Sequence, residues 1–263
     1  MKLYHYTPLS NFLLIWKDKR LKFSFSKNTN DFFERDKAYT ITPETFSYKG
    51  KRLSGEAFRR FRLDVEEELN RYRQVSFCRD YSVKMQGFSS PMMWGQYARS
   101  KNKDGNWQDG VCIELESDLM ERPSIPFYEH KVVYSDNIKI PFVRDIDFTK
   151  EDAAERFIVR NRNLLYFTKH RHWEYEREFR FISRSETSLG IENAITAIYV
   201  LNSGDSTLDE VENAVKDDSL IYFINMGFTK GRHFVALNLK GYRDDLDFMK
   251  QWNENIEVKK GNK

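Results

Sequence analysis

Hydrophobic and polar positions along the chain follow two periods, and each period predicts one kind of element. Alternation at every second position is typical of half-buried strands. It predicts strands over residues 2–7, 21–26, 73–80, 110–115, 130–136, 173–182, 194–201, 220–225 and 233–239. Recurrence at helical spacing predicts helices over residues 10–18, 54–73, 91–100, 151–167 and 205–215.

Local signals support two of these helices. Ser10 is a plausible N-cap for the first helix, and Pro91 suits the first turn of the short helix 91–100. Residues 101–110 (KNKDGNWQDG) are dense in Gly, Asn and Asp, which predicts a loop.

The predicted strands outnumber the helices and do not alternate regularly with them. That order favours an α+β fold with a mostly antiparallel sheet and peripheral helices over a doubly wound fold. Neither a repeat nor a low-complexity linker interrupts the chain, so we expect a single domain over residues 1–258, followed by a basic disordered tail at 259–263.

Composition indicates a folded protein with no clear charge signature. Hydrophobic residues make up 40% of the 263 positions and charged residues 32%, which excludes intrinsic disorder. The formal net charge is only +3, although the 43 Lys and Arg residues occur partly in runs. Charge therefore neither requires nor excludes a basic patch.

The two cysteines and the chain start point to the cytoplasm. Cys78 and Cys112 lie in apolar strand-like runs, where we expect buried free thiols. The start MKLYHYTPLS lacks the pattern of a signal peptide, and no apolar stretch is long enough to span a bilayer. His170 and His172 would share a strand face, but no third ligand is evident, so we expect no metal site.

Three groups of residues carry possible chemistry. His5 lies on the first strand, and its structural alternative is a histidine satisfied by the backbone. Trp94 and Tyr97 lie three apart on one helix face, where aromatic residues are usually core. In WEYEREFRFI, residues 173–182, three glutamates occupy alternate positions, so a strand would place their carboxylates on one face. They are either balanced by neighbouring arginines or used in a reaction.

The order of these motifs resembles a known bacterial family. The segments LYHYTPLSNFLLIWKDKRLKFS, NDFFE, VSFC, MMWGQYA with GVCIEL, KVVY and WEYEREFRFI follow the order of domain of unknown function 2971, from Leu3 to about Val200. The family usually has Asn-Asp-Pro-Phe-Glu where this chain has Asn30-Asp31-Phe32-Phe33-Glu34. The proline-fixed turn is therefore absent.

That arrangement in turn resembles the ADP-ribosyltransferase fold, including its DNA- and RNA-modifying toxin branch. In those enzymes a first strand carries His followed by Ser or Thr, and a late strand opens with a catalytic Glu, sometimes within Glu-x-Glu. The resemblance implies a split sheet and a glycosyltransferase that uses NAD as substrate, acting as a toxin or antiviral defence effector. The acceptor would be RNA, DNA or protein, and an antitoxin or defence-system partner is possible. Fold analogy alone does not fix function.

The resemblance also assigns roles to residues. Glu178 would be the catalytic carboxylate that stabilises the oxocarbenium-like transition state, and Glu176 would orient or deprotonate the acceptor. A neighbouring carboxylate would raise the proton affinity of Glu176. His5, with Tyr97 as the aromatic partner, would complete the catalytic set.

The same resemblance implies a set of NAD contacts. They comprise His5, Tyr6, Thr7, Asn30, Asp31, Trp94 and Arg180. Trp94 is the alternative to Tyr97 for stacking on nicotinamide, and Arg180 would hold the carboxylates or a diphosphate oxygen.

Other reactions lack their signatures. The chain has no Rossmann glycine fingerprint, no Walker loop and no Gly-x-Ser-x-Gly elbow. Two alternatives stay open: an NAD glycohydrolase that uses the same site with water, and a non-catalytic module that binds nucleic acid or protein. Burial of Glu178 against an arginine would favour the module.

Overall fold

The computed structural model describes residues 1–25, 47–48, 51–52, 55–82, 85–123, 127–138, 141, 147, 150–184, 188–201, 206–225 and 235–239. Contacts divide the chain into two compact units. Unit 1 comprises Met1–Arg20, Asp80–Met120 and Ile191–Lys263, and unit 2 comprises Leu21–Arg79 and Glu121–Gly190. The single domain over 1–258 stays a prediction, and the tail at 259–263 lies outside the described residues.

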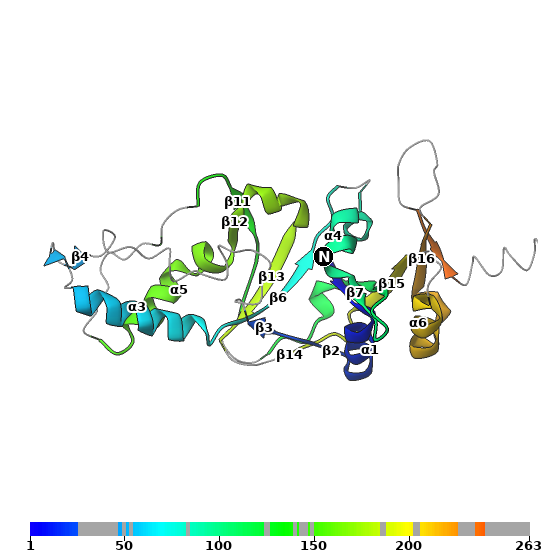
Figure 1. Cartoon of the computed structure of the whole chain (residues 1–263), viewed down its shortest axis with the longest axis horizontal. Helices are drawn as coiled ribbons and strands as arrows, with labels where there is room; N and C mark the ends of the chain where they lie inside the picture. Colours follow the sequence, from blue (N-terminus) through cyan, green and yellow to red (C-terminus); the bar gives the residue numbers. More distant parts are fainter. Residues whose placement is uncertain are drawn as a thin grey trace, which may run out of the picture. The chain divides into compact units, whose positions relative to one another are not determined.

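Unit 1 is built on a five-stranded array. Its order is β1 (Lys2–Thr7), β9 (Val111–Glu116), β15 (Ile195–Leu201), β16 (Ile221–Asn225) and β17 (Val235–Asn238) (Figure 1). Every neighbouring pair is antiparallel except β15 and β16, which are parallel. The unit's remaining elements are the helices α1 (Leu9–Asp18), α4 (Pro91–Tyr97) and α6 (Thr207–Val215), the 3-10 helices η4 (Gly87–Ser89), η5 (Ser117–Leu119) and η7 (Asp218–Leu220), and the strands β7 (Arg99–Lys101) and β8 (Trp107–Asp109).

Unit 2 combines an antiparallel array with a helix pair. β10 (Phe127–Lys131), β13 (Glu178–Ser183), β6 (Arg73–Cys78) and β3 (Ser24–Phe25) pair in that order. The helices α3 (Gly55–Leu69) and α5 (Ala153–Tyr166) lie side by side (Figure 1). Further elements within the described ranges are β2 (Arg20–Lys22), β4 (Ser47–Tyr48), β5 (Lys51–Arg52), β11 (Val133–Ser135), β12 (Thr168–His170), β14 (Ser188–Gly190) and the 3-10 helix η6 (Arg171–Glu176). The predicted α+β class with a mostly antiparallel sheet is confirmed.

The core of unit 2 explains why α3 and α5 are helical. Their apolar residues recur at helical spacing and meet between the two helices. Phe61 and Phe157, both buried, pack edge to face with ring centroids 5.8 Å apart. Tyr166, at the end of α5 in this core, contacts the carboxylate site described below through its backbone carbonyl.

The alternation of β1 sorts its side chains onto two faces. Tyr6 packs edge-on against Trp94 of α4, with ring centroids 5.2 Å apart, and its hydroxyl donates to the Gly87 carbonyl at 2.6 Å. Tyr4 contacts Phe88 on the same face. His5 therefore points to the opposite face, opposite Ile113 in the β9 register.

Several predicted boundaries are wrong. Ser10 does not cap α1, because the helix begins at Leu9 with Pro8 at the N-cap. The helix predicted over 54–73 ends at Leu69, and the strand predicted over 173–182 begins only at Glu178. The loop predicted over 101–110 contains most of the β7–β8 hairpin.

Other expectations agree with the structure. Pro91 is at the start of α4, and the Ser90 hydroxyl accepts a hydrogen bond from the Met93 backbone N–H. Cys78 and Cys112 are buried free thiols. Among the described residues, no helix has both the length and the apolar character needed to cross a bilayer.

Candidate functional site

The three glutamates of WEYEREFRFI do not share a strand face. Residues Arg171–Glu176 form the 3-10 helix η6, which ends at Arg177 in the left-handed region, with φ of 48°. Glu174 on this helix is exposed, whereas Glu176 and Glu178 are buried. The expectation of alternate positions on one strand is wrong, because β13 begins only at Glu178.

A backbone contact fixes the turn that precedes Glu178. The carbonyl of Arg177 accepts hydrogen bonds from the Arg79 backbone N–H at 3.1 Å and from Arg79 Nε at 3.2 Å. Burial, followed by repulsion from Arg177, lowers the pKa of Arg79. The end of β6 therefore holds the left-handed turn in place.

Glu178 and Arg180 form a bidentate pair inside unit 2. Arg180 Nε lies 2.8 Å from Glu178 Oε1, and the NH2 nitrogen lies 2.6 Å from Oε2. Arg180 is fully buried, and its NH1 nitrogen donates to the Tyr166 carbonyl at 2.7 Å. Arg180 thus contacts the Glu178 carboxylate, which is one of the two roles expected for it, and the expected contact with a diphosphate oxygen stays a prediction.

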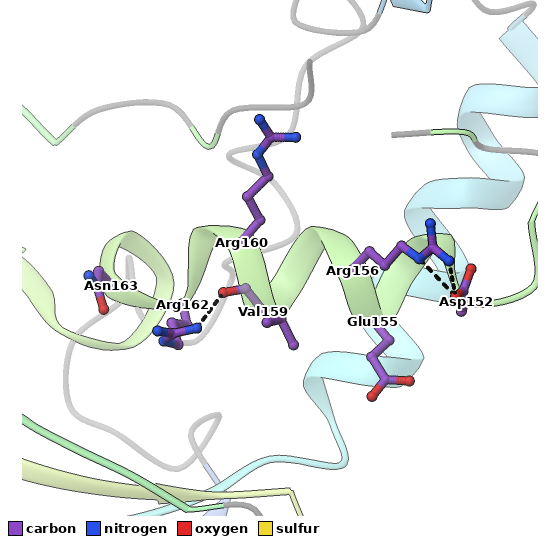
Figure 2. Close-up of a pocket in the computed structure, with 7 residues that line it drawn as sticks. All are labelled: Asp152, Glu155, Arg156, Val159, Arg160, Arg162 and Asn163. Atoms are coloured by element: carbon purple, nitrogen blue, oxygen red, sulfur yellow. Dashed lines mark hydrogen bonds and ion pairs between the residues drawn. The ribbon is translucent and has the colours of Figure 1, made fainter. Parts of the chain in front are cut away.

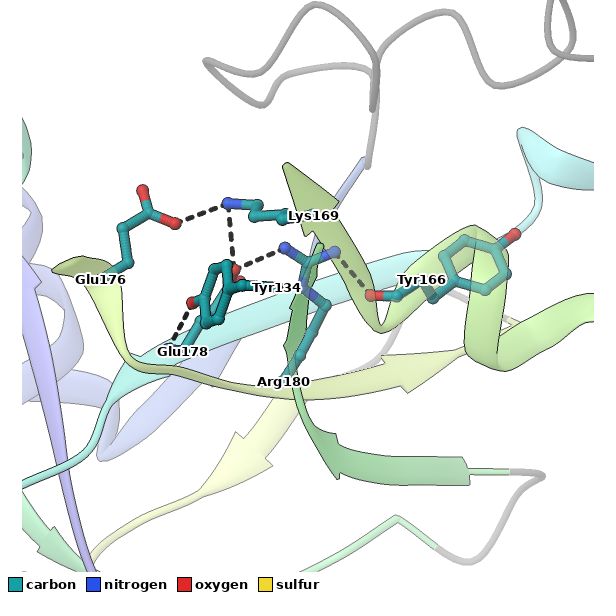
Figure 3. Close-up of polar contacts among 6 residues, drawn as sticks. All are labelled: Tyr134, Tyr166, Lys169, Glu176, Glu178 and Arg180. Carbon is teal, nitrogen blue, oxygen red and sulfur yellow. Dashed lines mark hydrogen bonds and ion pairs between the residues drawn. The ribbon is translucent and has the colours of Figure 1, made fainter. Parts of the chain in front are cut away.

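Lys169 joins the two buried carboxylates (Figure 3). Its Nζ lies 2.6 Å from Glu176 Oε2 and 3.0 Å from Glu178 Oε2. The Glu178 backbone N–H donates to the Tyr134 hydroxyl at 2.9 Å. Two carboxylates thus face two cations, so the repulsion between the carboxylates that we expected from the sequence is offset by Lys169.

This environment keeps Glu178 ionised. Burial alone raises the pKa of its carboxyl group, but the charges of Arg180 and Lys169 and hydrogen bonds from Ser76 and Arg180 outweigh burial and lower the pKa to about 2. Burial also raises the pKa of Tyr134, so that its phenol stays neutral. Glu178 therefore stays a carboxylate at neutral pH, although its charge and that of Glu176 are balanced by Lys169 and Arg180.

The predicted residues of unit 1 occupy different environments. Trp94 is 4% exposed, and its indole N–H donates to the Phe88 carbonyl at 2.8 Å. Thr7 is buried, whereas His5 is half-buried on the face of β1 turned away from α4. Tyr97 is half-buried at the last position of α4. Trp94 and Tyr6 thus form a core pair, and Tyr97 is the better placed for a ligand.

A second buried carboxylate in unit 1 escaped the sequence analysis. Glu114, 2% exposed, accepts hydrogen bonds from Thr196 and Tyr199 at 2.8 Å each and pairs with Lys2 at 2.8 Å. Burial raises the pKa of Glu114, but these three partners outweigh burial and lower it. The sequence signal that could have revealed Glu114 is its position as an acidic residue inside the apolar run VCIEL, residues 111–115.

Among the described residues, cavities adjoin the helix pair of unit 2. A cavity of about 440 Å³ is lined by residues of α5 and by Asp152, which precedes it; there Arg156 pairs with Asp152, and Arg162 donates to the Val159 carbonyl (Figure 2). One of about 340 Å³ adjoins Glu68 and Arg184, which pair at 2.8 Å. Glu178 lines neither cavity.

Two further expectations concern Asn30 and Asp31 as NAD contacts and a metal ion. Asn30 and Asp31 lie outside the described residues. In the described ranges, no group of three His, Cys, Asp or Glu side chains could hold a metal ion.

Comparison with known proteins gives a family similarity. A family model described as protein of unknown function (DUF2971) matches residues 93–181, about a third of the chain. The matched part contains Trp94, Tyr97, Glu176, Glu178 and Arg180, and His5 lies outside it. No curated protein and no solved structure matches the chain. The chain is thus similar to this family over the segment that ends in the buried carboxylate site.

Proposed function

We propose that the protein is an NAD-dependent ADP-ribosyltransferase. One observation carries the proposal: β13 opens with Glu178, an ionised carboxylate fixed by Arg180 and Lys169, two positions after Glu176. A preorganised negative charge is what the cleavage of the nicotinamide–ribose bond requires, because positive charge develops on the ribose ring.

The reaction assigns a task to each carboxylate. The bond between the ribose C1′ and the nicotinamide nitrogen breaks, and nicotinamide leaves with the electron pair. Glu178 stabilises the cationic sugar, while Glu176 takes the proton of the acceptor nucleophile that bonds to C1′. With water as acceptor, the same steps would make the protein an NAD glycohydrolase.

His5, Thr7 and Tyr97 belong to unit 1, so the ribose and nicotinamide contacts expected of them from the sequence stay predictions. The acceptor is a protein or a nucleic acid. As a toxin or defence effector, the protein would arrest growth when expressed, and an active-site substitution would relieve the arrest.

The experiment measures NAD loss by chromatography with purified protein, alone and with cell lysate. We expect the Glu178→Gln and Glu176→Gln variants to lose on the order of 10²–10³ in rate. Glu174→Gln is the matched control, because Glu174 is exposed on the same 3-10 helix, and it should keep the wild-type rate. Mass spectrometry separates an ADP-ribosylated acceptor from free ADP-ribose. Wild-type activity in Glu178→Gln would refute the assigned roles.

A second candidate, a non-catalytic binding module, is favoured by the burial of the same residue. Glu178 is 4% exposed, and both of its oxygens contact cations of the protein itself. In this case the ion pairs among Lys169, Glu176, Glu178 and Arg180 have no catalytic role and only stabilise unit 2. Absence of NAD loss from the wild type in every lysate, together with lower stability of Glu178→Gln, would support the module and exclude the transferase.

A further inference from the structure

The β7–β8 hairpin of unit 1 carries an exposed indole between two cations. Trp107 is 59% exposed, which is high for the largest apolar side chain. The Arg99 guanidinium carbon lies 5.3 Å from the Trp107 ring centroid, and Lys101 Nζ lies 5.7 Å from it. A single exposed apolar residue is common on protein surfaces, but an exposed indole close to two cations combines an aromatic surface with positive charge, and both are features of binding surfaces.

The register of the hairpin places these groups on one face. Arg99 is opposite Asp109, and Lys101 is opposite Trp107. Since alternate residues of a strand share a face, all four side chains project from the same side of the ribbon.

The other face of the ribbon is attached to the protein. Gln108 points to that side, and its Nε2 donates to Glu210 Oε1 of α6 at 3.1 Å. The Thr207 hydroxyl donates to the Asp109 carbonyl at 2.9 Å. The Trp107 face is therefore held outward by contacts with α6.

The tip of the hairpin is ordered by its own hydrogen bonds. The side-chain oxygen of Asn102 accepts from the backbone N–H groups of Asp104 at 3.0 Å and Asn106 at 2.9 Å. Gly105 takes the left-handed conformation, with φ of 82°, that such a turn requires. A rigid aromatic platform loses little entropy when a ligand stacks on it.

Charge on this face favours an anionic ligand. Asp109 is largely buried and pairs with Arg99 at 3.4 Å, so it contributes little negative charge at the surface. Lys101 and Lys103 are exposed and have no ionic partner among the residues that the structure describes. The turn between the two strands, residues 102–106, contains one acidic residue, Asp104.

We propose that the Trp107 face of the β7–β8 hairpin binds single-stranded nucleic acid. A base would stack on the indole, and Arg99, Lys101 and Lys103 would contact the phosphates. Bases of a single strand are free to stack, whereas those of a duplex are not, and aromatic rings beside cations are the usual platform for single strands. The proposal does not depend on NAD chemistry.

Fluorescence anisotropy with labelled single-stranded dT15 and rU15 tests this proposal on the full chain. We expect Trp107→Ala to weaken binding about tenfold or more, and Trp107→Phe, which keeps an aromatic ring, to retain part of the affinity. Lys101→Gln should reduce the slope of log affinity against log salt by about 0.7. Leu119→Ala, which removes another exposed apolar side chain of unit 1, is the matched control and should bind as the wild type.

Unfolding midpoints in urea confirm that each variant is folded. Equal affinity of wild type and Trp107→Ala for both oligonucleotides would overturn the proposal, as would no binding by the wild type. Tighter binding of duplex DNA would also overturn it. Competition by polyglutamate as effective as that by dT15 would assign the face to an acidic polypeptide instead and refute the nucleic-acid partner.

Discussion

The buried pair Glu178–Arg180 predicts a specific dependence of stability on pH. The carboxyl group has a folded-state pKa of about 2, against an ordinary value of 4.5. Because the folded pKa is the lower one, the stabilisation is complete above about pH 5 and is lost as the pH falls through 4.5 towards 2. The shift corresponds to about 3 kcal/mol at neutral pH.

The perturbation is Glu178→Gln, which keeps the size of the side chain and removes its charge. Breaking one partner of a buried ion pair costs about 3–5 kcal/mol, which agrees with the magnitude obtained from the pKa. Since native domains are stable by about 5–15 kcal/mol, the variant should still fold at 25 °C.

The assay is urea unfolding between pH 6 and pH 3, followed by circular dichroism and tryptophan fluorescence. The stability difference between the wild type and Glu178→Gln should shrink by about 2 kcal/mol from pH 6 to pH 3, because protonation of Glu178 in the unfolded wild type removes its advantage. Glu174→Gln should stay within about 0.5 kcal/mol of the wild type throughout. A difference for Glu178→Gln that is the same at both pH values would refute the reasoning.

Two further predictions concern stability at neutral pH. Replacing Arg180 by Met should lower the free energy of unfolding by about 3–5 kcal/mol, because Glu178 would lose its bidentate partner inside the protein, and a loss below 1 kcal/mol in urea unfolding would contradict this. Gly110→Ala should destabilise unit 1 by about 1–3 kcal/mol, since the added Cβ would collide with the backbone carbonyls of Thr7 and Ala98. The matched control is Gly95→Ala on α4, where the added Cβ enters open space and should raise the unfolding temperature slightly. Equal unfolding temperatures of the two variants would be incompatible with this packing.

Local patterns predicted the elements that have strong local signals. The alternation of residues 2–7 gave β1, and Pro91 marked the start of α4. The β7–β8 hairpin was missed because Gly, Asn and Asp in KNKDGNWQDG are typical of loops, while the two strands that pair are only three residues long each. Turn-rich sequence alone does not distinguish an open loop from a short hairpin.

The candidate site was predicted in part. The sequence indicated that Arg180 lies on the same strand face as Glu178, because this follows from alternation. Alternation placed the start of that strand at Trp173, five residues before its observed start. It did not indicate Lys169, which comes from β12 and bridges two carboxylates by tertiary packing. Nor did it indicate that residues 171–176 form η6, on which Glu174 is exposed and Glu176 is buried, since the left-handed Arg177 that ends this helix is unusual for a non-glycine residue.

The order of strands in unit 1 has a consequence for synthesis on the ribosome. The first strand, β1, pairs with β9, and β9 pairs with β15. Lys2 can therefore pair only after Glu116 has been translated, and Ile113 can pair with Ile198 only after β15 has been translated. All of unit 2 up to Gly190 is translated before β15 emerges. Unit 1 thus cannot complete its hydrogen-bonded core co-translationally until late, and the nascent apolar strands β1 and β9 are the segments for which a chaperone would have the longest opportunity to bind.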